Sequence, residues 1–142
     1  MAGALRKAYE KAKSNGCPDK CIKIYIEAHS QGGAITANAL KLVSAEIKNH
    51  VFLTTLGSQW DHSGEGLAGA RNIHNKYDIV PKLPNQTSKR FKKYPIETFD
   101  PASLGFPKGE EDGPISAHTL LDSTNKSDGS YYKYREQHPW GK

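Results

Sequence analysis

Alternating and helical patterns of apolar residues divide the first part of the chain into strands and helices. Residues 21–28, CIKIYIEA, alternate isoleucine with polar side chains, which predicts a strand with one buried face. Residues 50–56, HVFLTTL, are a continuous apolar and β-branched run, which predicts a strand buried on both faces. Between them, residues 31–48 predict a helix, because apolar side chains recur at helical spacing at Ile35, Ala39, Leu42, Val43 and Ile47.

A further helix is predicted before the first strand. Residues 2–14 contain good helix formers and place Leu5, Ala8 and Tyr9 on one stripe. An Asn-Gly pair and a proline then end the helix. The order strand, helix, strand predicts an α/β fold, a mostly parallel sheet flanked by helices, in a single domain over residues 1–142.

The second half of the chain gives shorter and weaker patterns. Residues 70–75 predict a third strand, and residues 91–99, FKKYPIETF, predict a fourth. Pro95 would put that fourth strand at an edge of the sheet. From Asp100 onward the sequence predicts mostly irregular structure, with a short helix at residues 116–123.

Composition narrows the classes of partner. The net charge of +5 and the isoelectric point near 9.1 favour an anionic partner, such as an acidic lipid surface. Because the lysines are spread along the chain, a solvated basic surface is the alternative. Nucleic acid is not expected, because the aromatic residues are scattered rather than gathered on one basic sheet face.

Neither the N-terminus nor the cysteines indicate a special compartment. No apolar run approaches the roughly 20 residues that a membrane helix needs, and the first residues lack the apolar core of a signal peptide. A cytoplasmic location and export by a non-classical route both stay open. Cys17 and Cys21 are too few for a zinc site, so we expect two ordinary thiols, with a local disulfide as the alternative.

Ser30 lies where the first strand ends and the helix begins, in the stretch AHSQGG. A serine at such a corner takes a strained backbone conformation, so that its hydroxyl projects above the sheet. The residues two before and two after it must be small, because strand and helix approach closely there. Ala28 and Gly32 meet this demand, and Gly33 is expected to add slack. These features predict a nucleophile, with a merely tight turn as the alternative.

The helix after Ser30 would also contribute to a reaction there. Its first N–H groups and positive dipole end would point at the serine, where an oxyanion would develop. The backbone N–H of Gln31 is the first candidate donor to that oxyanion.

Three segments, in this order along the chain, resemble the α/β-hydrolases, and within them the lipases and lipase-like esterases. IYIEAHSQGGAI, residues 24–35, resembles the nucleophile elbow. VFLTTLGSQ, residues 51–59, is similar to the next lipase strand, which often ends in Thr-x-Gly-Ser. IHNKYDIVPKLPN, residues 73–85, resembles the segment with the acidic triad member, commonly written Asp-x-Val-Pro. The resemblance covers residues 20–122.

This resemblance implies a catalytic triad in the chain order of the fold. Ser30 would be the nucleophile, Asp78 the acid and His118, in ISAHTLLDS, the base. Such a reaction needs neither a metal ion nor a cofactor. His138 is the main alternative to His118, and Asp61 to Asp78.

The other candidates are given structural roles. We expect His29 to point away from the neighbouring serine and to be structural or to line a pocket. Solvated or turn roles suffice for the loop acids, and structural roles are expected at the strand ends. These residues are Asp61, Asp100 and Asp112 among the acids, and His50 and His74 among the histidines.

The expected function is hydrolysis of a carboxylic ester, and specifically of a lipid, through an acyl-enzyme. Residues 88–94, SKRFKKY, could meet an anionic lipid headgroup, or could be a solvated edge guarded by lysines. The family pattern also implies strands upstream of the elbow strand, one of which supplies a second oxyanion donor, and only 20 residues precede Cys21. The chain is thus expected to be a reduced hydrolase or the C-terminal part of a longer protein. The alternative function is a catalytically incomplete module that binds or assembles through an exposed sheet edge.

Overall fold

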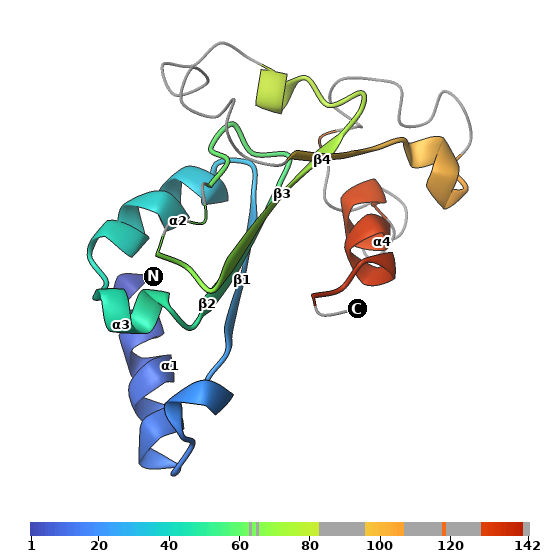
Figure 1. The fold of residues 1–142 in the computed structure, drawn as a ribbon. Helices are drawn as coiled ribbons and strands as arrows, with labels where there is room; N and C mark the ends of the chain where they lie inside the picture. Colours follow the sequence, from blue (N-terminus) through green and yellow to red (C-terminus); the bar gives the residue numbers. More distant parts are fainter. Residues whose placement is uncertain (63, 65, 83–95, 107–117, 119–128, 141–142) are drawn as a thin grey trace.

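Four parallel strands form the sheet at the centre of the fold (Figure 1). The computed structural model describes residues 1–62, 64, 66–82, 96–106, 118 and 129–140. In the order in which they neighbour one another, the strands are β1 Ile24–His29, β2 Val51–Leu56, β3 Gly69–Asn75 and β4 Ile96–Phe99. The register pairs Ile24 with Val51 and His29 with Leu56, so β1 and β2 end side by side.

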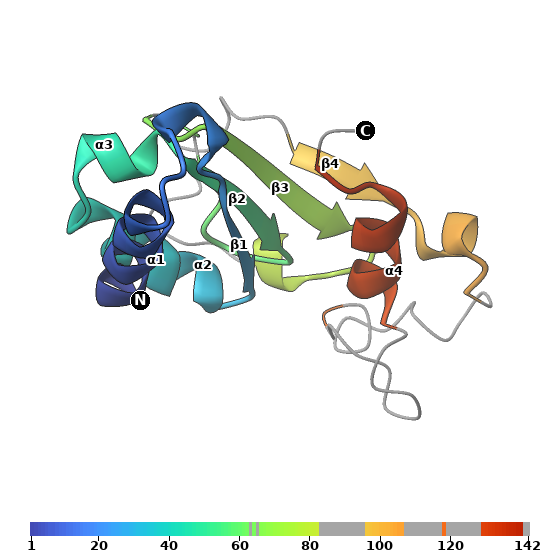
Figure 2. The same cartoon turned by 90° about the horizontal axis from the view of Figure 1, so that it is seen from below.

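Helices cover both faces of this sheet (Figures 1 and 2). One face carries α1 Ala2–Ser14, α2 Gly32–Lys41 and α3 Ala45–Lys48, and the other carries α4 Ser130–Gln137. The short helical turns η1 Asp19–Cys21, η2 Val80–Lys82 and η4 Pro101–Leu104 lie in the connections. The prediction of an α/β fold with a parallel sheet flanked by helices is confirmed.

The sheet separates two apolar cores. The larger one lies beneath α1, α2 and α3, where Leu5, Leu40 and Ile47 pack against Val51 and Leu53. The smaller core lies beneath α4 and consists of Leu56, Ile73, Phe99 and Tyr131. Because β2 contributes to both cores, it is buried on both faces, as its continuous apolar sequence predicts.

The predicted helix over residues 31–48 is wrong as a single element. The chain forms α2 and α3 instead, with a break after Lys41 and with Ser44 as the N-cap of α3. The break changes which apolar residues are buried, because α3 takes a new direction. Ile35 and Leu42 are exposed, while Val43 and Ile47 reach the core beside α1.

The C-terminal part also differs from the prediction of irregular structure. Helix α4 closes the second face of the sheet, and its aromatic residues Tyr131 and Tyr134 face the core. The fourth strand begins at Ile96, and β4 is an edge strand as Pro95 indicated. The rest of that predicted segment, residues 91–95, and the helix predicted at 116–123, apart from His118, lie outside the described residues.

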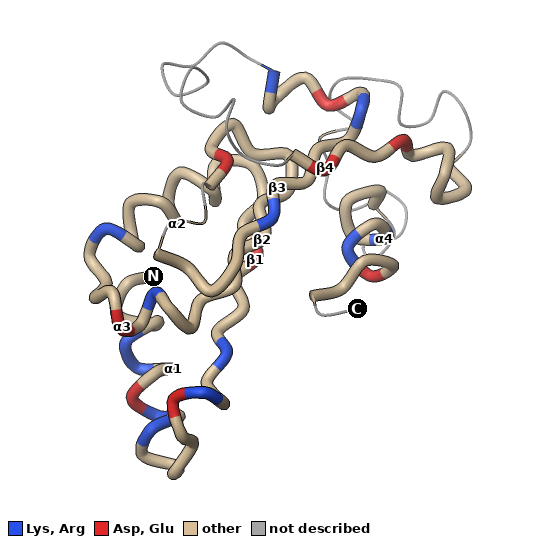
Figure 3. The backbone as a smooth tube through the Cα atoms, viewed as in Figure 1, with Lys and Arg blue, Asp and Glu red and all other residues tan. Residues whose placement is uncertain are grey.

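Charged residues do not gather into one surface of a single sign in the described part of the chain. Lys and Arg lie on all four helices, and acidic residues are interspersed with them along the chain (Figure 3). Cys17 and Cys21 are both free thiols. No helix in the described ranges combines the length and the apolar character that crossing a membrane requires.

Candidate active site

The connection from β1 to α2 is a sharp turn at Ser30. Its φ angle is 53°, and within the described residues it is the one residue other than glycine with a positive φ. The Ser30 N–H donates to the carbonyl oxygen of Leu56 at 3.0 Å, which holds the turn at the end of β2. A serine in this region is strained by roughly 1–3 kcal/mol, and such strain is concentrated at functional sites.

The close approach expected around this turn occurs at a different glycine. A Cβ on Gly32 would lie 3.7 Å from the Cβ of Ala28, which is an ordinary contact. A Cβ on Gly33 would instead lie 2.1 Å from the Ser58 Oγ and 3.1 Å from the Trp60 carbonyl oxygen. The expectation that Gly33 adds slack is therefore wrong, because it is the position at which α2 packs tightly on the loop after β2.

Three side chains that are far apart in the sequence meet at Ser30. The Nε2 atom of His118 lies 2.8 Å from the Ser30 Oγ, and its Nδ1 atom lies 2.8 Å from Asp78 Oδ2. Asp78 is fully buried, whereas the imidazole keeps about a fifth of its surface exposed. With the Nδ1 proton directed at the carboxylate, Nε2 is left as an acceptor for the serine hydroxyl.

The carboxylate of Asp78 has other hydrogen-bond donors besides His118. Its Oδ1 accepts from the backbone N–H of Val80 at 2.8 Å, and its Oδ2 accepts from the Tyr131 hydroxyl at 2.6 Å. Tyr131 is also fully buried, and burial together with the neighbouring carboxylate raises the pKa of its hydroxyl far above the ordinary value. Sequence reasoning assigned Tyr131 no role here, although Tyr131 and Tyr134 at a spacing of three could have indicated an apolar helix face.

His29 contacts the main chain of His118 rather than the serine beside it. Its Nε2–H donates to the His118 carbonyl oxygen at 2.7 Å, and the two rings lie 4.9 Å apart. Burial lowers the pKa of the His29 imidazole, which favours the neutral form. The His29 side chain thus packs beside His118 and Tyr131, which agrees with the expected structural role.

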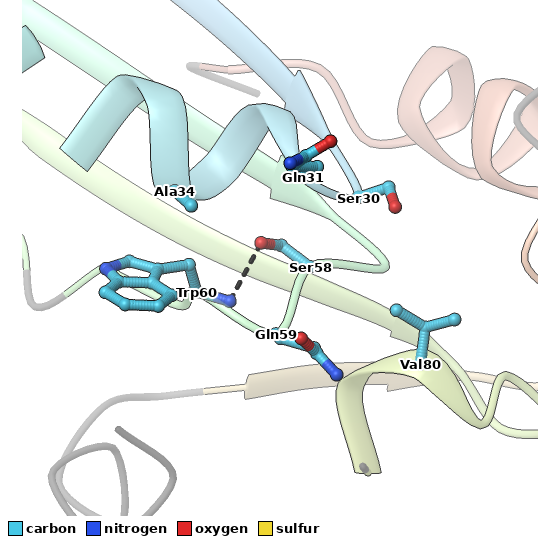
Figure 4. Close-up of a pocket in the computed structure, with 7 residues that line it drawn as sticks. All are labelled: Ser30, Gln31, Ala34, Ser58, Gln59, Trp60 and Val80. Carbon is cyan, nitrogen blue, oxygen red and sulfur yellow. Dashed lines mark hydrogen bonds between the residues drawn. The ribbon is translucent and has the colours of Figure 1, made fainter. Parts of the chain in front are cut away.

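A cleft of about 380 Å³ opens beside the serine. Figure 4 shows Ser30, Gln31 and Ala34 at the start of α2 on one side, and Ser58, Gln59 and Trp60 on the other, with Val80 nearby. The volume lies in the range of small-ligand sites. Gln31 lines this cleft, and its backbone N–H donates to no described residue.

The alternative candidates lie elsewhere. His138 caps the end of α4 and stacks on Tyr134, on the other face of the sheet from α2. Asp100 caps η4 and pairs with Lys76. Asp112 lies outside the described residues.

Asp61 is a correction to the sequence analysis. It is not a solvated loop residue, because only 6% of its surface is exposed and its Oδ1 lies 2.9 Å from His74 Nε2. The pair ties the loop after β2 to β3. Sequence reasoning treated the two residues separately, since they are thirteen positions apart in the chain.

No group of three or more potential metal ligands occurs within the part of the chain that the structure describes. Comparison of the chain with protein-family models, with curated proteins and with solved structures finds no match. What the site can do therefore rests on its own geometry.

Proposed function

We propose that the protein is a serine hydrolase of the α/β-hydrolase type that cleaves a carboxylic ester, with a lipid as the favoured substrate. One observation carries the proposal. Ser30, whose φ lies in the left-handed region, is hydrogen-bonded to His118, and His118 is hydrogen-bonded in turn to the buried Asp78. A serine hydroxyl is a weak nucleophile until a neighbouring base takes its proton, and this arrangement supplies the base.

The proposed reaction has two stages. Ser30 Oγ attacks the ester carbonyl carbon while its proton passes to His118 Nε2, and Asp78 balances the charge of the imidazolium. The N–H of Gln31 stabilises the oxyanion, and the imidazolium then gives its proton to the departing alcohol. In the second stage water attacks the acyl-serine with His118 again as base, which releases the acid and restores the serine.

The cleft supports an apolar acyl or alcohol group in the substrate. Ala34, Trp60 and Val80 give it apolar walls, and Ser30 lies at its edge. The proposed contact with an anionic membrane surface falls on residues 88–94, which lie outside the described residues. A second oxyanion donor would matter, because the loss of one such donor typically costs on the order of 10²–10³ in rate.

The test is intact-mass spectrometry after exposure to a fluorophosphonate, which reports an activated serine without requiring the right substrate. Wild type should gain one adduct and Ser30→Ala none. Ser58→Ala should still gain one, because it removes the other serine that lines the cleft. With an ester substrate, Ser30→Ala should lower turnover by about 10⁶. A folded wild-type protein that stays unmodified would contradict the proposal.

One observation favours the alternative, an incomplete module that assembles through a sheet edge. The N–H groups of Ile24 and Ser30 donate to carbonyl oxygens on the β2 side of β1. Because alternate residues of a strand face opposite edges, the main-chain groups of Tyr25 and Glu27 point to the other edge of β1. No described strand pairs with that edge. Antiparallel pairing of two copies about Tyr25 would place Lys23 opposite the partner's Glu27.

Sedimentation of wild type and variants separates this alternative from a monomeric enzyme. A dimer of this kind should weaken in Glu27→Lys, which would set like charges opposite each other. Arg135→Ala is the matched control, because it breaks the ion pair of Arg135 with Glu27 without changing the strand edge. A wild type that sediments as a monomer at high concentration would remove the alternative.

A further inference from the structure

Helix α4 brings one hydroxyl into the group of residues at Ser30. Tyr131 lies 53 positions after Asp78 in the chain, yet its hydroxyl donates to Asp78 Oδ2 at 2.6 Å. The same hydroxyl accepts from the backbone N–H of Asn75 at 2.9 Å. A phenol with one donor and one acceptor site in use is fixed in orientation, because its proton can point only at the carboxylate.

The surroundings leave this hydroxyl little freedom to move. Tyr131 is fully buried, and its ring packs edge-on against Phe99 at 5.4 Å. On the other side, a Cβ added to Gly57 would lie 2.8 Å from the Tyr131 oxygen and 2.6 Å from Asp78 Oδ2. The main chain at Gly57 therefore packs closely against both Tyr131 and Asp78.

The same oxygen of Asp78 serves both Tyr131 and His118. Oδ2 lies 2.8 Å from His118 Nδ1, while Oδ1 is occupied by the N–H of Val80. The carboxylate thus has three donors that fix its plane and share its negative charge. A donor that takes part of that charge also sets how strongly the carboxylate holds a protonated imidazole.

We infer that Tyr131 is a positioning residue for the reaction of Ser30: it fixes the Asp78 carboxylate toward His118 and limits how strongly that carboxylate stabilises the imidazolium. The inference rests on the proposed function of the site. It assigns the C-terminal helix a part in the chemistry, in addition to covering the sheet.

Tyr131→Phe tests the inference through the pH dependence of labelling by a fluorophosphonate. Without the hydroxyl, Asp78 holds the protonated imidazole more strongly, so His118 becomes a free base only at higher pH. The acidic limb of the rate profile should move upward by about half to one pH unit. Among the described residues, the groups that face His118 are Ser30, Asp78 and His29, and all three are kept in this variant.

Tyr134→Phe is the matched control. It removes another tyrosine hydroxyl of α4, which lies 3.5 Å from Glu97 and is hydrogen-bonded to none of Ser30, Asp78 and His118. Its acidic limb should coincide with that of wild type. Rates are compared after normalisation to the folded fraction measured by circular dichroism.

A second variant covers the case in which Tyr131→Phe fails to fold. Site-specific 3-fluorotyrosine at position 131 keeps the packing and the hydroxyl, and makes the hydroxyl a stronger donor. The acidic limb should then move to lower pH, opposite to the phenylalanine variant. A purely structural role for Tyr131 would not produce shifts of opposite sign.

The outcomes distinguish the two proposals. Labelling of wild type with an acidic limb that stays unchanged in both variants at position 131 would overturn the positioning role alone. A folded wild type that is never labelled would overturn the proposed function and the positioning role with it. Opposite shifts, with no shift in Tyr134→Phe, would establish the role.

Discussion

The ends of β1 and β2 lie side by side, and the chain turns in the same way at both. The φ angle is 53° at Ser30 and 55° at Gly57, the residues that follow the paired His29 and Leu56. Glycine is the residue that this region favours, because a Cβ costs roughly 1–2 kcal/mol there. The second turn therefore has the expected residue, while the first retains a residue that costs stability.

The space at the two turns explains the difference. At Gly57 a Cβ would meet Asp78 Oδ2 at 2.6 Å, so no side chain fits. At Ser30 a side chain is present, and its oxygen lies 2.8 Å from Nε2 of the His118 imidazole. Close packing thus explains why position 57 is a glycine. The contact of the Ser30 hydroxyl with His118 gives a reason for a serine at position 30. Strain without a packing reason is a sign of chemistry.

The largest effect is expected for Gly57→Ala. The added methyl group would be strained by the positive φ and would displace Asp78 or Tyr131. The two costs together should lower the free energy of unfolding by about 2–5 kcal/mol. Labelling of Ser30 by a fluorophosphonate should fall as well, because Asp78 moves from His118. Urea denaturation and the labelling rate measure the two effects.

Gly16→Ala is the control for the backbone cost. Gly16 has a φ of 77° with nothing within 4 Å of an added Cβ. Its substitution should cost only the backbone term and leave labelling unchanged. Equal losses of stability in Gly16→Ala and Gly57→Ala would show that the clash with Asp78 does not matter.

A smaller effect is expected where the first turn packs on the second. Gly33 of α2 approaches Ser58 and Trp60, which follow Gly57, and an added Cβ would lie 2.1 Å from the Ser58 Oγ. Gly33→Ala should lower the free energy of unfolding by about 1–3 kcal/mol, as overpacking does. Thermal unfolding measures this, with tryptophan fluorescence reporting on Trp60 in the displaced loop.

Gly32→Ala is the matched neighbour of that variant. Its Cβ would make only a 3.7 Å contact, and alanine favours a helix over glycine by roughly 1 kcal/mol. Gly32→Ala should therefore be neutral or stabilising. The opposite ranking of the two variants would mean that the close approach is at Gly32, two residues after Ser30, as the sequence pattern suggested.

The local part of this fold could be predicted from the sequence. The strand at residues 50–56 and the corner at Ser30 depend on neighbouring residues, whose pattern is visible in the chain. The break between α2 and α3 could not be predicted, because a period of 3.6 runs through it. What decides there is the packing of Val43 and Ile47 beside α1, which is a tertiary effect.

The site was predictable to the extent that a family pattern covered it. Ser30, Asp78 and His118 were selected by resemblance, and the structure brings these three together. Contacts outside that pattern were missed. The contact of Tyr131 with Asp78 and the contact of Asp61 with His74 each join residues that are far apart in the chain. Such separations leave no periodic signal in the sequence. Only the folded sheet shows that they meet.

The smallest expected effect separates the backbone of Ser30 from its hydroxyl. Ser30→Gly and Ser30→Ala both remove the proposed nucleophile, so neither should be labelled. They differ in strain, because glycine accepts a φ of 53° and alanine does not. Ser30→Gly should unfold at a temperature roughly 4 °C higher than Ser30→Ala, which corresponds to about 1 kcal/mol.

Ser103 supplies the reverse case. It lies in η4 outside the left-handed region and is exposed, so glycine there should be less stable than alanine. If glycine is the less stable residue at both positions, the turn at Ser30 relaxes when its side chain is removed. The strain would then come from the contact with His118 rather than from the β1–α2 connection, and the comparison with Gly57 would lose its basis.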